Sequence, residues 1–176
     1  MKETKNNASR RAFVKKMAAG AALLGTSGPA ILYGNNETEQ HALSRLTRFS
    51  ANDNIQIALI GAGGMGTEDT KTALQVPGTK LVAVCDLYTG RLTEAKGRWG
   101  NDLFTTKDYR EILDRKDIDA VIIATPDHWH KQISVDALLK GKGAYCEKPM
   151  VQNVAEGSAV VQAQQKSGKT FQVGSQ

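Results

Sequence analysis

The sequence predicts an α/β protein built on a doubly wound parallel sheet, and three observations support that prediction. From residue 55 onward, short apolar runs alternate with segments of helical spacing or composition. The apolar runs are nearly continuous, as in strands buried on both faces. A glycine-rich turn directly follows the first of them. Strands and helices that alternate in this way form right-handed βαβ units, which bind ligands at the carboxyl ends of the strands.

Six apolar runs are predicted strands. IQIALI and KLVAVCD come first, and LFTT is a short, weak third strand. DAVIIAT is the strongest, GAYCEKP runs into a turn, and TFQVGSQ is the last. In chain order the predicted strands occupy residues 55–60, 80–86, 103–106, 119–125, 143–149 and 170–176.

Five helices are predicted between these strands. The first is a polar, amphipathic segment after the glycine-rich turn, and the last stops at a glycine. The predicted helical segments are 67–75, 87–99, 107–115, 130–141 and 154–168. The apolar positions that share one helical face are Tyr109, Ile112 and Leu113 in the third segment and Ile133, Ala137 and Leu138 in the fourth.

The N-terminal 34 residues have the features of an export signal. A basic segment precedes an uncharged stretch rich in Ala, Gly and Leu, residues 17–33. The segment SRRAFVKK resembles the bacterial twin-arginine signal, Ser-Arg-Arg-x-Phe-x-Lys. The matching residues are Ser9, Arg10, Arg11, Phe13 and Lys15. The resemblance implies that residues 1–34 direct a folded, cofactor-loaded protein to the periplasm.

The uncharged stretch is a poor membrane span. It is short and only mildly apolar, whereas a transmembrane helix needs about 20 strongly apolar residues. No clear small-x-small cleavage site is present, so an uncleaved signal that tethers the protein to the membrane stays open. Residues 35–53 are polar and unpatterned and are predicted to be a linker. Residues 54–176 are the predicted folded domain.

Charge and cysteine content exclude several other classes of protein. Residues 1–34 hold six of the 23 basic residues and one of the 18 acidic residues, so the remainder is balanced at 17 of each. A nucleic-acid partner is therefore not expected. Cys85 and Cys146 each follow an apolar run and are expected to be small buried hydrophobic residues. Their spacing does not match a zinc site.

The glycine-rich turn has the spacing of a dinucleotide fingerprint. Gly61, Gly63 and Gly66 form GxGxxG between a strand and a helix, and Asp86 ends the next strand 20 residues after Gly66. Gly61 permits the tight turn, Gly63 lets a pyrophosphate approach the backbone, and Gly66 lets the helix pack closely. The helix N-terminus then offers N–H groups to the phosphates. Asp86 favours NAD because it accepts hydrogen bonds from ribose hydroxyls, while Arg91 leaves NADP open.

The runs IALIGAGGMG, AVCD, VIIATPDHWH and CEKP together resemble the Gfo/Idh/MocA oxidoreductase family in order and spacing. The resemblance spans about residues 54–176 and corresponds to the family's N-terminal NAD(P)-binding Rossmann domain. The family's second domain carries most substrate contacts and the oligomer interface, and the sequence holds no counterpart to it. We therefore expect this chain to be a fragment of a longer protein, with any homo-oligomer formed through the missing domain.

The resemblance implies a role for each residue of the Glu-Lys-Pro turn. Lys148 matches the lysine beside the nicotinamide and the reacting hydroxyl, so it is the expected catalytic residue that takes the hydroxyl proton. Glu147 would contact the cofactor or orient Lys148, and Pro149 would fix the turn. The other cofactor-binding residues implied by the resemblance are Gly64 and Met65 in the glycine-rich turn and Thr125, Pro126 and His130 after the strongest strand.

The stretch ATPDHWH also raises the alternative of a metal site. His128 and His130 are two residues apart, whereas paired metal ligands on a helix are typically four apart. The sequence provides no third ligand cluster, so a metal is not expected. His128 is then expected to face solvent or the substrate entrance, and Trp129 to be a packing or substrate-gating residue.

Three functions stay open at this point. The first is an exported NAD(P)-dependent oxidoreductase that transfers a hydride between its cofactor and a sugar, cyclitol or related polyol. The second is a glycosidase that retains NAD and oxidises C3 transiently, as exported relatives of this fold do. The third is a non-catalytic dinucleotide-binding module, which the missing substrate domain suggests. The Glu-Lys-Pro turn favours the first.

Overall fold

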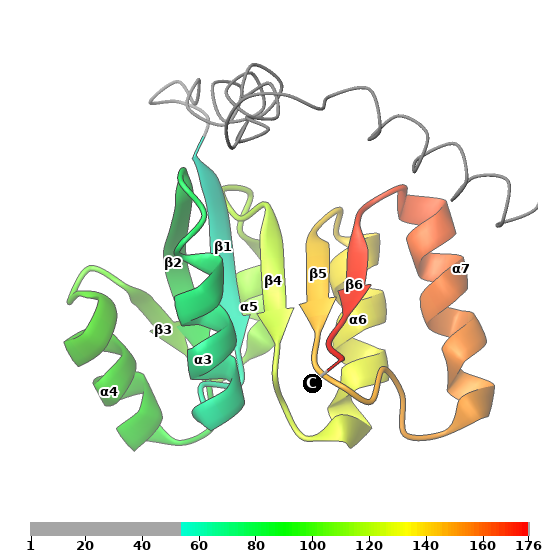
Figure 1. Cartoon of the computed structure of the whole chain (residues 1–176), viewed down its shortest axis with the longest axis horizontal. Helices are drawn as coiled ribbons and strands as arrows, with labels where there is room; N and C mark the ends of the chain where they lie inside the picture. The colour runs from blue at the N-terminus through cyan, green and yellow to red at the C-terminus, as the bar shows by residue number, and fades with distance from the viewer. Residues whose placement is uncertain (1–53, 176) are drawn as a thin grey trace, which may run out of the picture. The chain divides into compact units, whose positions relative to one another are not determined.

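The computed structural model describes residues 54–175, and the predicted signal and linker lie outside this range. Within it, six parallel strands form one sheet in the order β3-β2-β1-β4-β5-β6, with helices on both faces (Figure 1). This arrangement confirms the doubly wound α/β class. The strands are β1 Ile55–Ile60, β2 Thr79–Cys85, β3 Phe104–Thr106, β4 Ala120–Ile123, β5 Gly143–Cys146 and β6 Phe171–Val173.

Every predicted helix is present in the structure. The helices are α3 Gly64–Ala73, α4 Thr89–Trp99, α5 Tyr109–Asp114, α6 His130–Leu139 and α7 Gly157–Ser167, with short 3₁₀ turns at Asp127–Trp129 and Val154–Glu156. The predicted strands 119–125 and 143–149 end earlier than expected, because the chain leaves the sheet after Ile123 and Cys146. No helix in the part of the chain described is long and apolar enough to cross a membrane.

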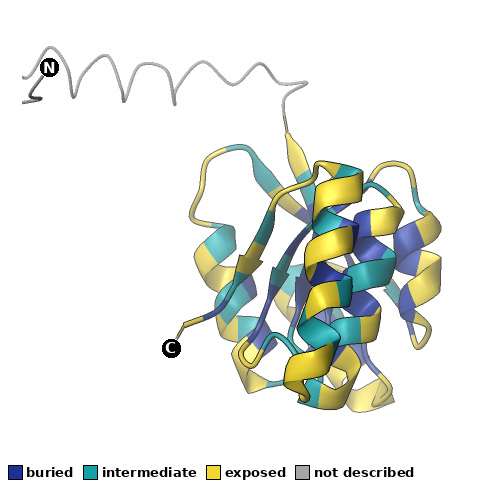
Figure 2. Ribbon diagram, turned by 90° about the vertical axis from the view of Figure 1, so that its right-hand side faces the viewer, coloured by how far each residue is buried: buried dark blue, intermediate teal, exposed yellow. Residues whose placement is uncertain are grey.

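The alternating side chains of β1 supply two hydrophobic cores, one on each face of the sheet. Leu59 is fully buried and packs with Leu92 and Ala95 of α4 on one face. Ala58 is fully buried on the other face, in the cluster that holds residues of α5 and α6. Figure 2 shows the buried strands inside and exposed outer faces on the helices. Full burial of one Leu or Ile side chain contributes about 1.5–3 kcal/mol, so this packing fixes the sheet that carries the site.

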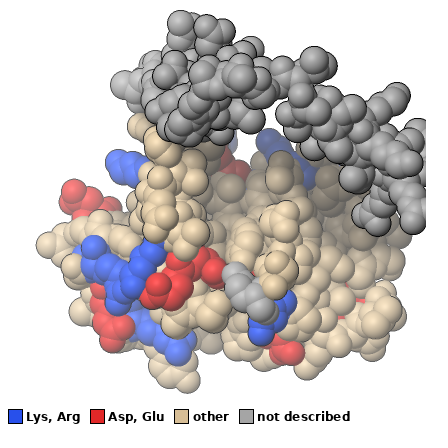
Figure 3. Space-filling model, viewed as in Figure 1, with Lys and Arg blue, Asp and Glu red and all other residues tan. Residues whose placement is uncertain are grey.

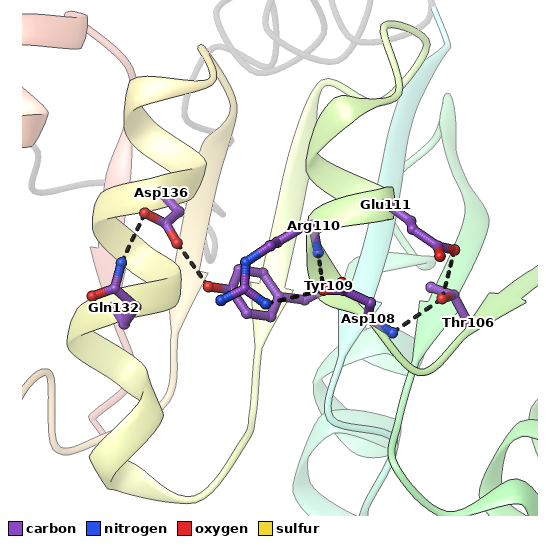
Figure 4. Close-up of polar contacts among 7 residues, drawn as sticks. All are labelled: Thr106, Asp108, Tyr109, Arg110, Glu111, Gln132 and Asp136. Atoms are coloured by element: carbon purple, nitrogen blue, oxygen red, sulfur yellow. Dashed lines mark hydrogen bonds and ion pairs between the residues drawn. The ribbon is translucent and has the colours of Figure 1, made fainter.

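Helices α5 and α6 cover one face of the sheet and are joined by a polar contact (Figure 4). The Tyr109 hydroxyl donates to Asp136 at 2.7 Å, and the Gln132 amide donates to the same carboxylate at 2.9 Å. Burial and the Asp136 carboxylate raise the pKa of Tyr109 to about 12, so the hydroxyl stays protonated and able to donate. Asp108 caps α5 by accepting from the Arg110 N–H at 3.0 Å.

Both cysteines are buried free thiols, as predicted. Cys85 ends β2 and Cys146 ends β5, and β1 and β4 lie between these two strands. Burial raises the pKa of Cys85 to about 12 and that of Cys146 to about 11, so both pack as neutral thiols.

Candidate functional site

The candidate site lies along the carboxyl edge of the sheet, where the loops after β1, β2, β4 and β5 meet. All strands are parallel, so their carboxyl ends share one edge. The chain runs outward from β1 to β2 and β3, then returns to β4 on the other side of β1. Such a reversal opens a crevice in which doubly wound proteins bind ligands. Every site residue predicted from the sequence belongs to one of these four loops or borders it.

The turn after β1 brings α3 close to the sheet. Gly61 has a φ of 97°, and a Cβ there would lie 2.5 Å from the Ala124 carbonyl oxygen. A Cβ on Gly66 would lie 2.1 Å from the Gly61 carbonyl oxygen and 3.0 Å from the Ala124 methyl. Both positions therefore require glycine, one for its backbone conformation and both for the close approach of helix to strand.

The start of α3 is open to an anionic ligand. A Cβ on Gly64 would have no neighbour within 4 Å, and a Cβ on Gly63 would meet only the Arg91 guanidinium at 3.7 Å. The first turn of α3 carries no acidic residue and no side-chain cap, which leaves its N–H groups and the positive end of its dipole to a ligand. This cradle fits the pyrophosphate of a dinucleotide. Met65 is half-exposed on the same turn.

Asp86 is held rigidly at the end of β2. Its carboxylate is buried and accepts from the Ala62 N–H at 2.8 Å and from the Tyr88 N–H at 2.9 Å. Arg91 pairs with the same carboxylate at 3.3 Å and stacks over the Tyr88 ring at 5.1 Å. Asp86 therefore ties the glycine-rich turn to the loop after β2, in the place where a ribose would lie.

Charges of both signs surround this part of the molecule. Figure 3 shows basic and acidic side chains interspersed over the face that carries α3 and α4. Lys71 pairs with Glu68 at 2.7 Å on α3, and Arg91 pairs with Asp86. The charges on this face are therefore largely compensated locally rather than gathered into one basic field.

A cavity of about 330 Å³ opens beside the first turn of α3. It is bounded by residues from three of the four loops: Met65, Ala124, Thr125, Asp127, His130, Glu147 and Lys148. Five of these seven were predicted site residues, and the cavity brings them together. Ala124 and Asp127 belong to the ATPDHWH stretch but were not among the predicted cofactor-binding residues. Pro126 and Pro149 are exposed next to the cavity.

His130 joins the loop after β4 to the turn after β5. His130 is the first residue of α6, and it is only 1% exposed. Nδ1 lies 2.7 Å from the Pro149 carbonyl oxygen and Nε2 lies 2.8 Å from the Thr125 carbonyl oxygen. Because each ring nitrogen faces a backbone oxygen, His130 positions the loops that line the cavity. Its direct contact with a cofactor stays a prediction.

Glu147 and Lys148 occupy the turn after β5. Glu147 is only 5% exposed, and its Oε1 accepts from the Tyr145 hydroxyl at 3.0 Å. Its Oε2 accepts from the Lys148 N–H at 3.2 Å, so Glu147 holds the backbone of Lys148 in place. The Lys148 side chain is exposed and lines the cavity, and its peptide bond to Pro149 is cis.

Asp69 and Tyr145 are two neighbours of Glu147 that the sequence interpretation missed. Tyr145 lies in β5, two residues before Glu147, and its hydroxyl donates to the Glu147 carboxylate. Asp69 lies one helical turn after Gly66 on α3, and burial together with the negative charge of Glu147 raises the pKa of its carboxyl group to about 6. The spacing of Asp69 from Gly66 was the available signal, but Glu147 is far away in the sequence.

The histidine-rich loop has contacts that suit packing. The His128 ring is exposed and lies 3.8 Å from an Asp127 carboxylate oxygen. Trp129 is 41% exposed and meets the Tyr109 ring edge-on at 6.4 Å between centroids. Across residues 54–175, no three His, Cys, Asp or Glu side chains gather in an arrangement that could hold a metal ion.

The fold, the glycine cradle and Asp86 define a dinucleotide-binding domain of the Rossmann type. The chain belongs to the Gfo/Idh/MocA oxidoreductase family, because the model of that family's NAD-binding Rossmann fold matches residues 55–175. NAD(P) is the cofactor of this domain, and the family is enzymatic.

Curated relatives include dehydrogenases and glycosyl hydrolases. Inositol 2-dehydrogenase of Salmonella typhimurium is 32% identical over 116 residues, which cover 65% of this chain and 34% of that protein. A glycosyl hydrolase family 109 protein of Shewanella baltica is 30% identical over 183 aligned residues, which cover 93% of this chain and 38% of that protein. The chain thus spans about a third of the length of these relatives.

Solved structures of similar fold carry the same domain. Myo-inositol 2-dehydrogenase from Lactobacillus plantarum is 28% identical with a TM-score of 0.64, over 69% of this chain and 36% of that one. The WlbA dehydrogenase from Chromobacterium violaceum, solved with NADH and UDP-GlcNAcA, is 27% identical with a TM-score of 0.64, over 71% of this chain and 36% of that one.

Proposed function

We propose that the full-length protein is an NAD-dependent oxidoreductase that transfers a hydride between its cofactor and a sugar, cyclitol or related polyol. The observation that carries this proposal is the position of Lys148 at a cavity that Met65, in the first turn of α3, also lines. A proton acceptor and a phosphate cradle thus lie at one sheet edge. The inositol dehydrogenases among the similar proteins support the substrate class.

The residues of this chain have separate tasks in such a reaction. Bound NAD supplies the hydride-accepting carbon. Oxidation of a carbinol also requires its hydroxyl proton to leave, and the amine form of Lys148 accepts that proton while the carbonyl forms. Glu147 holds the Lys148 backbone, and His130 holds the Thr125 and Pro149 carbonyls that border the cavity. In the reverse direction the Lys148 ammonium returns the proton to the carbonyl oxygen.

Asp86 supports NAD over NADP as the preferred cofactor. Its buried carboxylate would repel a 2′-phosphate. Arg91, the cation that could bind such a phosphate, already pairs with the Asp86 carboxylate. Dissociation constants for NADH and NADPH test this preference, with tighter NADH binding as the expected result. Equal or tighter NADPH binding would assign Arg91 to the phosphate instead.

Substitution of Lys148 tests the proposed chemistry. In the full-length protein, Lys148→Ala should lower kcat by about 100-fold or more with a panel of cyclitols and sugars, the usual range for a lost general base. The NADH dissociation constant should change little. Lys140→Ala is the matched control, because Lys140 is an exposed lysine at the C-cap of α6 that pairs with Asp114. Unchanged turnover in Lys148→Ala would refute the assigned role.

A second candidate is a glycosidase that retains NAD and oxidises C3 of its substrate transiently. The glycosyl hydrolase relative from Shewanella baltica favours it, because that alignment covers 93% of this chain against 65% for the inositol dehydrogenase. Hydrolysis of an aryl glycoside by the purified protein without consumption of added NAD would favour this candidate. Stoichiometric reduction of added NAD by a free polyol would favour the dehydrogenase.

We also propose export to the periplasm by the twin-arginine route. The support is the motif at Arg10 and Arg11, which lies outside the described residues. Residues 1–53 fused to a reporter that must fold before export should deliver it to the periplasm. Arg10→Lys together with Arg11→Lys should retain it inside the cell. Cell fractionation would show whether the exported reporter is released into the periplasm or tethered to the membrane. Delivery of the double variant's reporter to the periplasm would refute the twin-arginine route.

A further inference from the structure

Tyr145 connects the hydrophobic core to the turn that carries Lys148. It lies in β5, and its partly buried ring packs against the cluster that holds Leu59 and Leu92. Its hydroxyl donates to Oε1 of Glu147 at 3.0 Å. The core therefore fixes the place of this donor, because a ring in close-packed surroundings has little room to move.

The Glu147 carboxylate is held at both oxygens. Oε1 accepts from the Tyr145 hydroxyl, and Oε2 accepts from the Lys148 N–H at 3.2 Å. With one donor on each oxygen, the carboxylate cannot rotate without breaking a hydrogen bond. Glu147 is only 5% exposed, so water has little access to replace a lost donor. Removal of the Tyr145 hydroxyl would therefore free the carboxylate to turn away from the Lys148 N–H.

Lys148 depends on its backbone for the direction of its side chain. The side chain is exposed at the cavity, and among residues 54–175 no carboxylate pairs with its ammonium group. The backbone, in contrast, is held on both sides of Lys148. Glu147 accepts from the Lys148 N–H, and the Pro149 carbonyl oxygen lies 2.7 Å from Nδ1 of His130. The Glu147 carboxylate is thus the restraint on the N-terminal side.

We propose that Tyr145 is a positioning residue that directs the Lys148 amine toward the reacting hydroxyl through the Glu147 carboxylate. This inference rests on the proposed function, which gives Lys148 its role as proton acceptor. Tyr145 is not one of the described residues that line the cavity, so it acts through Glu147 and not on the substrate. Its two contacts have separate tasks, because the ring places the donor and the hydroxyl orients the carboxylate.

The Tyr145 hydroxyl should matter more for turnover than for binding. A misplacement of about 1 Å in an active site can lower the rate about 100-fold, and complete loss of a general base costs about 100-fold or more. Tyr145→Phe keeps both the ring and Lys148, so it should lower kcat by less, about tenfold. KM and the NADH dissociation constant should change by less than about twofold, because the hydroxyl does not line the cavity.

Tyr109→Phe is the matched control for this substitution. The Tyr109 hydroxyl donates to the Asp136 carboxylate at 2.7 Å, so the control removes the same kind of hydrogen bond elsewhere in the molecule. Asp136 belongs to α6 and borders the groove between α5 and α6, not the cavity that Lys148 lines. Tyr109→Phe should therefore keep wild-type turnover even where both variants lose similar stability.

The first experiment follows the Lys148 N–H in the cofactor-free chain by NMR. Loss of the Tyr145 hydroxyl should let the Glu147 carboxylate rotate. The Lys148 amide proton should then shift upfield and exchange faster with water in Tyr145→Phe, because its acceptor is no longer held. In Tyr109→Phe its shift and exchange rate should stay as in wild type. An unchanged Lys148 amide in Tyr145→Phe would overturn the proposal, whatever the activity of the protein.

The second experiment measures turnover of the full-length protein with Tyr145→Phe in the wild-type and Lys148→Ala backgrounds. The substrate is the member of the cyclitol and sugar panel that the wild-type protein turns over fastest. We expect kcat to fall about tenfold in the first background and no further in the second, because the group that Tyr145 positions is then absent. A purely structural role would lower kcat by the same factor in both backgrounds.

The outcomes separate this inference from the proposed function. Wild-type kcat in Tyr145→Phe, or an equal loss in both backgrounds, would overturn the inference and leave Lys148 as the proton acceptor. Wild-type kcat in Lys148→Ala would refute the proposed role of Lys148 and, with it, the role of Tyr145 in turnover.

Discussion

Replacement of Gly66 by alanine should displace the start of α3 and weaken both the fold and the cofactor site. A Cβ there would lie 2.1 Å from the Gly61 carbonyl oxygen and 2.9 Å from a Leu59 methyl carbon. To restore even a 3.0 Å separation from the oxygen, the helix or the Gly61 peptide must shift by 0.9 Å. A backbone oxygen cannot rotate out of the way as a side chain can, so the shift extends to the N–H groups of the helix.

The size of the effect follows from two opposing contributions. Overpacking costs about 1–3 kcal/mol, and the upper end applies where backbone must move. Alanine in a helix gains about 1 kcal/mol over glycine, which leaves a net loss of about 2 kcal/mol. Gly97→Ala is the matched control, because Gly97 lies inside α4 and a Cβ there would meet nothing within 4 Å. The control should gain about 1 kcal/mol, so the two variants should differ by about 3 kcal/mol.

Urea denaturation followed by far-UV circular dichroism measures this difference. The urea midpoint of Gly66→Ala should lie below that of wild type, and the midpoint of Gly97→Ala should lie above it. The dependence of unfolding free energy on urea concentration should not change, because the surface area exposed on unfolding is nearly the same. Gly66→Ala should also bind NADH about tenfold more weakly or worse, since about 1.4 kcal/mol of lost phosphate contacts gives that factor. Stabilities within 0.5 kcal/mol of each other would refute the close-packing account of this glycine.

Three further predictions concern charged groups that are buried or partly buried. Asp86→Asn should weaken NADH binding about tenfold, because about one charge-assisted hydrogen bond is lost, and should reduce the preference for NADH over NADPH. Unchanged dissociation constants for both cofactors in calorimetry would show that Asp86 does not bind the ribose. The raised pKa of Asp69 means that the folded chain binds this proton more tightly than the unfolded chain, so the group lowers stability as pH rises from 3.8 to about 6. The free energy of unfolding of Asp69→Asn, relative to wild type, should therefore rise by about 1–2 kcal/mol between pH 4 and pH 7, after discounting for the partial exposure of Asp69. A difference in unfolding free energy that stays constant over this pH range in urea denaturation would contradict this prediction. Lys142 is 6% exposed and donates to the Arg115 and Ile118 carbonyls at 2.5 and 2.8 Å. Lys142→Met should therefore lower the free energy of unfolding by about 1–3 kcal/mol in urea denaturation. An unchanged free energy of unfolding would show that these carbonyls find other donors.

Local steric rules made the fold and the phosphate cradle predictable. The spacing of Gly61, Gly63 and Gly66 predicts the turn after β1, because the conformation of that turn depends only on residues 61–66. The nearly continuous apolar run from Ile55 to Ile60 is typical of a strand in a parallel sheet, and residues 57–60 are buried between two parallel neighbours. Asp86 followed because its distance from the last glycine reflects the length of one helix and one strand.

Contacts between distant segments could not be predicted in the same way. His130 was expected at the start of a helix, but its bond to the Pro149 carbonyl depends on how the loops after β4 and β5 approach each other. The effect of the Glu147 charge on the pKa of Asp69 likewise depends on the docking of α3 onto the sheet. Lys142 has the composition of a surface lysine, and only the fold places two carbonyl oxygens around its ammonium group.

An NMR titration of the isotope-labelled chain with NADH tests most directly whether the carboxyl edge is the cofactor site. We expect the backbone amide shifts to change at residues 61–66, at Asp86, at residues 124–130 and at residues 147–149. The groove of about 370 Å³ between α5 and α6, represented by Leu113, should remain unchanged because it lies away from these loops. Saturable changes confined to the four segments would support the account. Changes centred on that groove, or none at millimolar NADH, would contradict it.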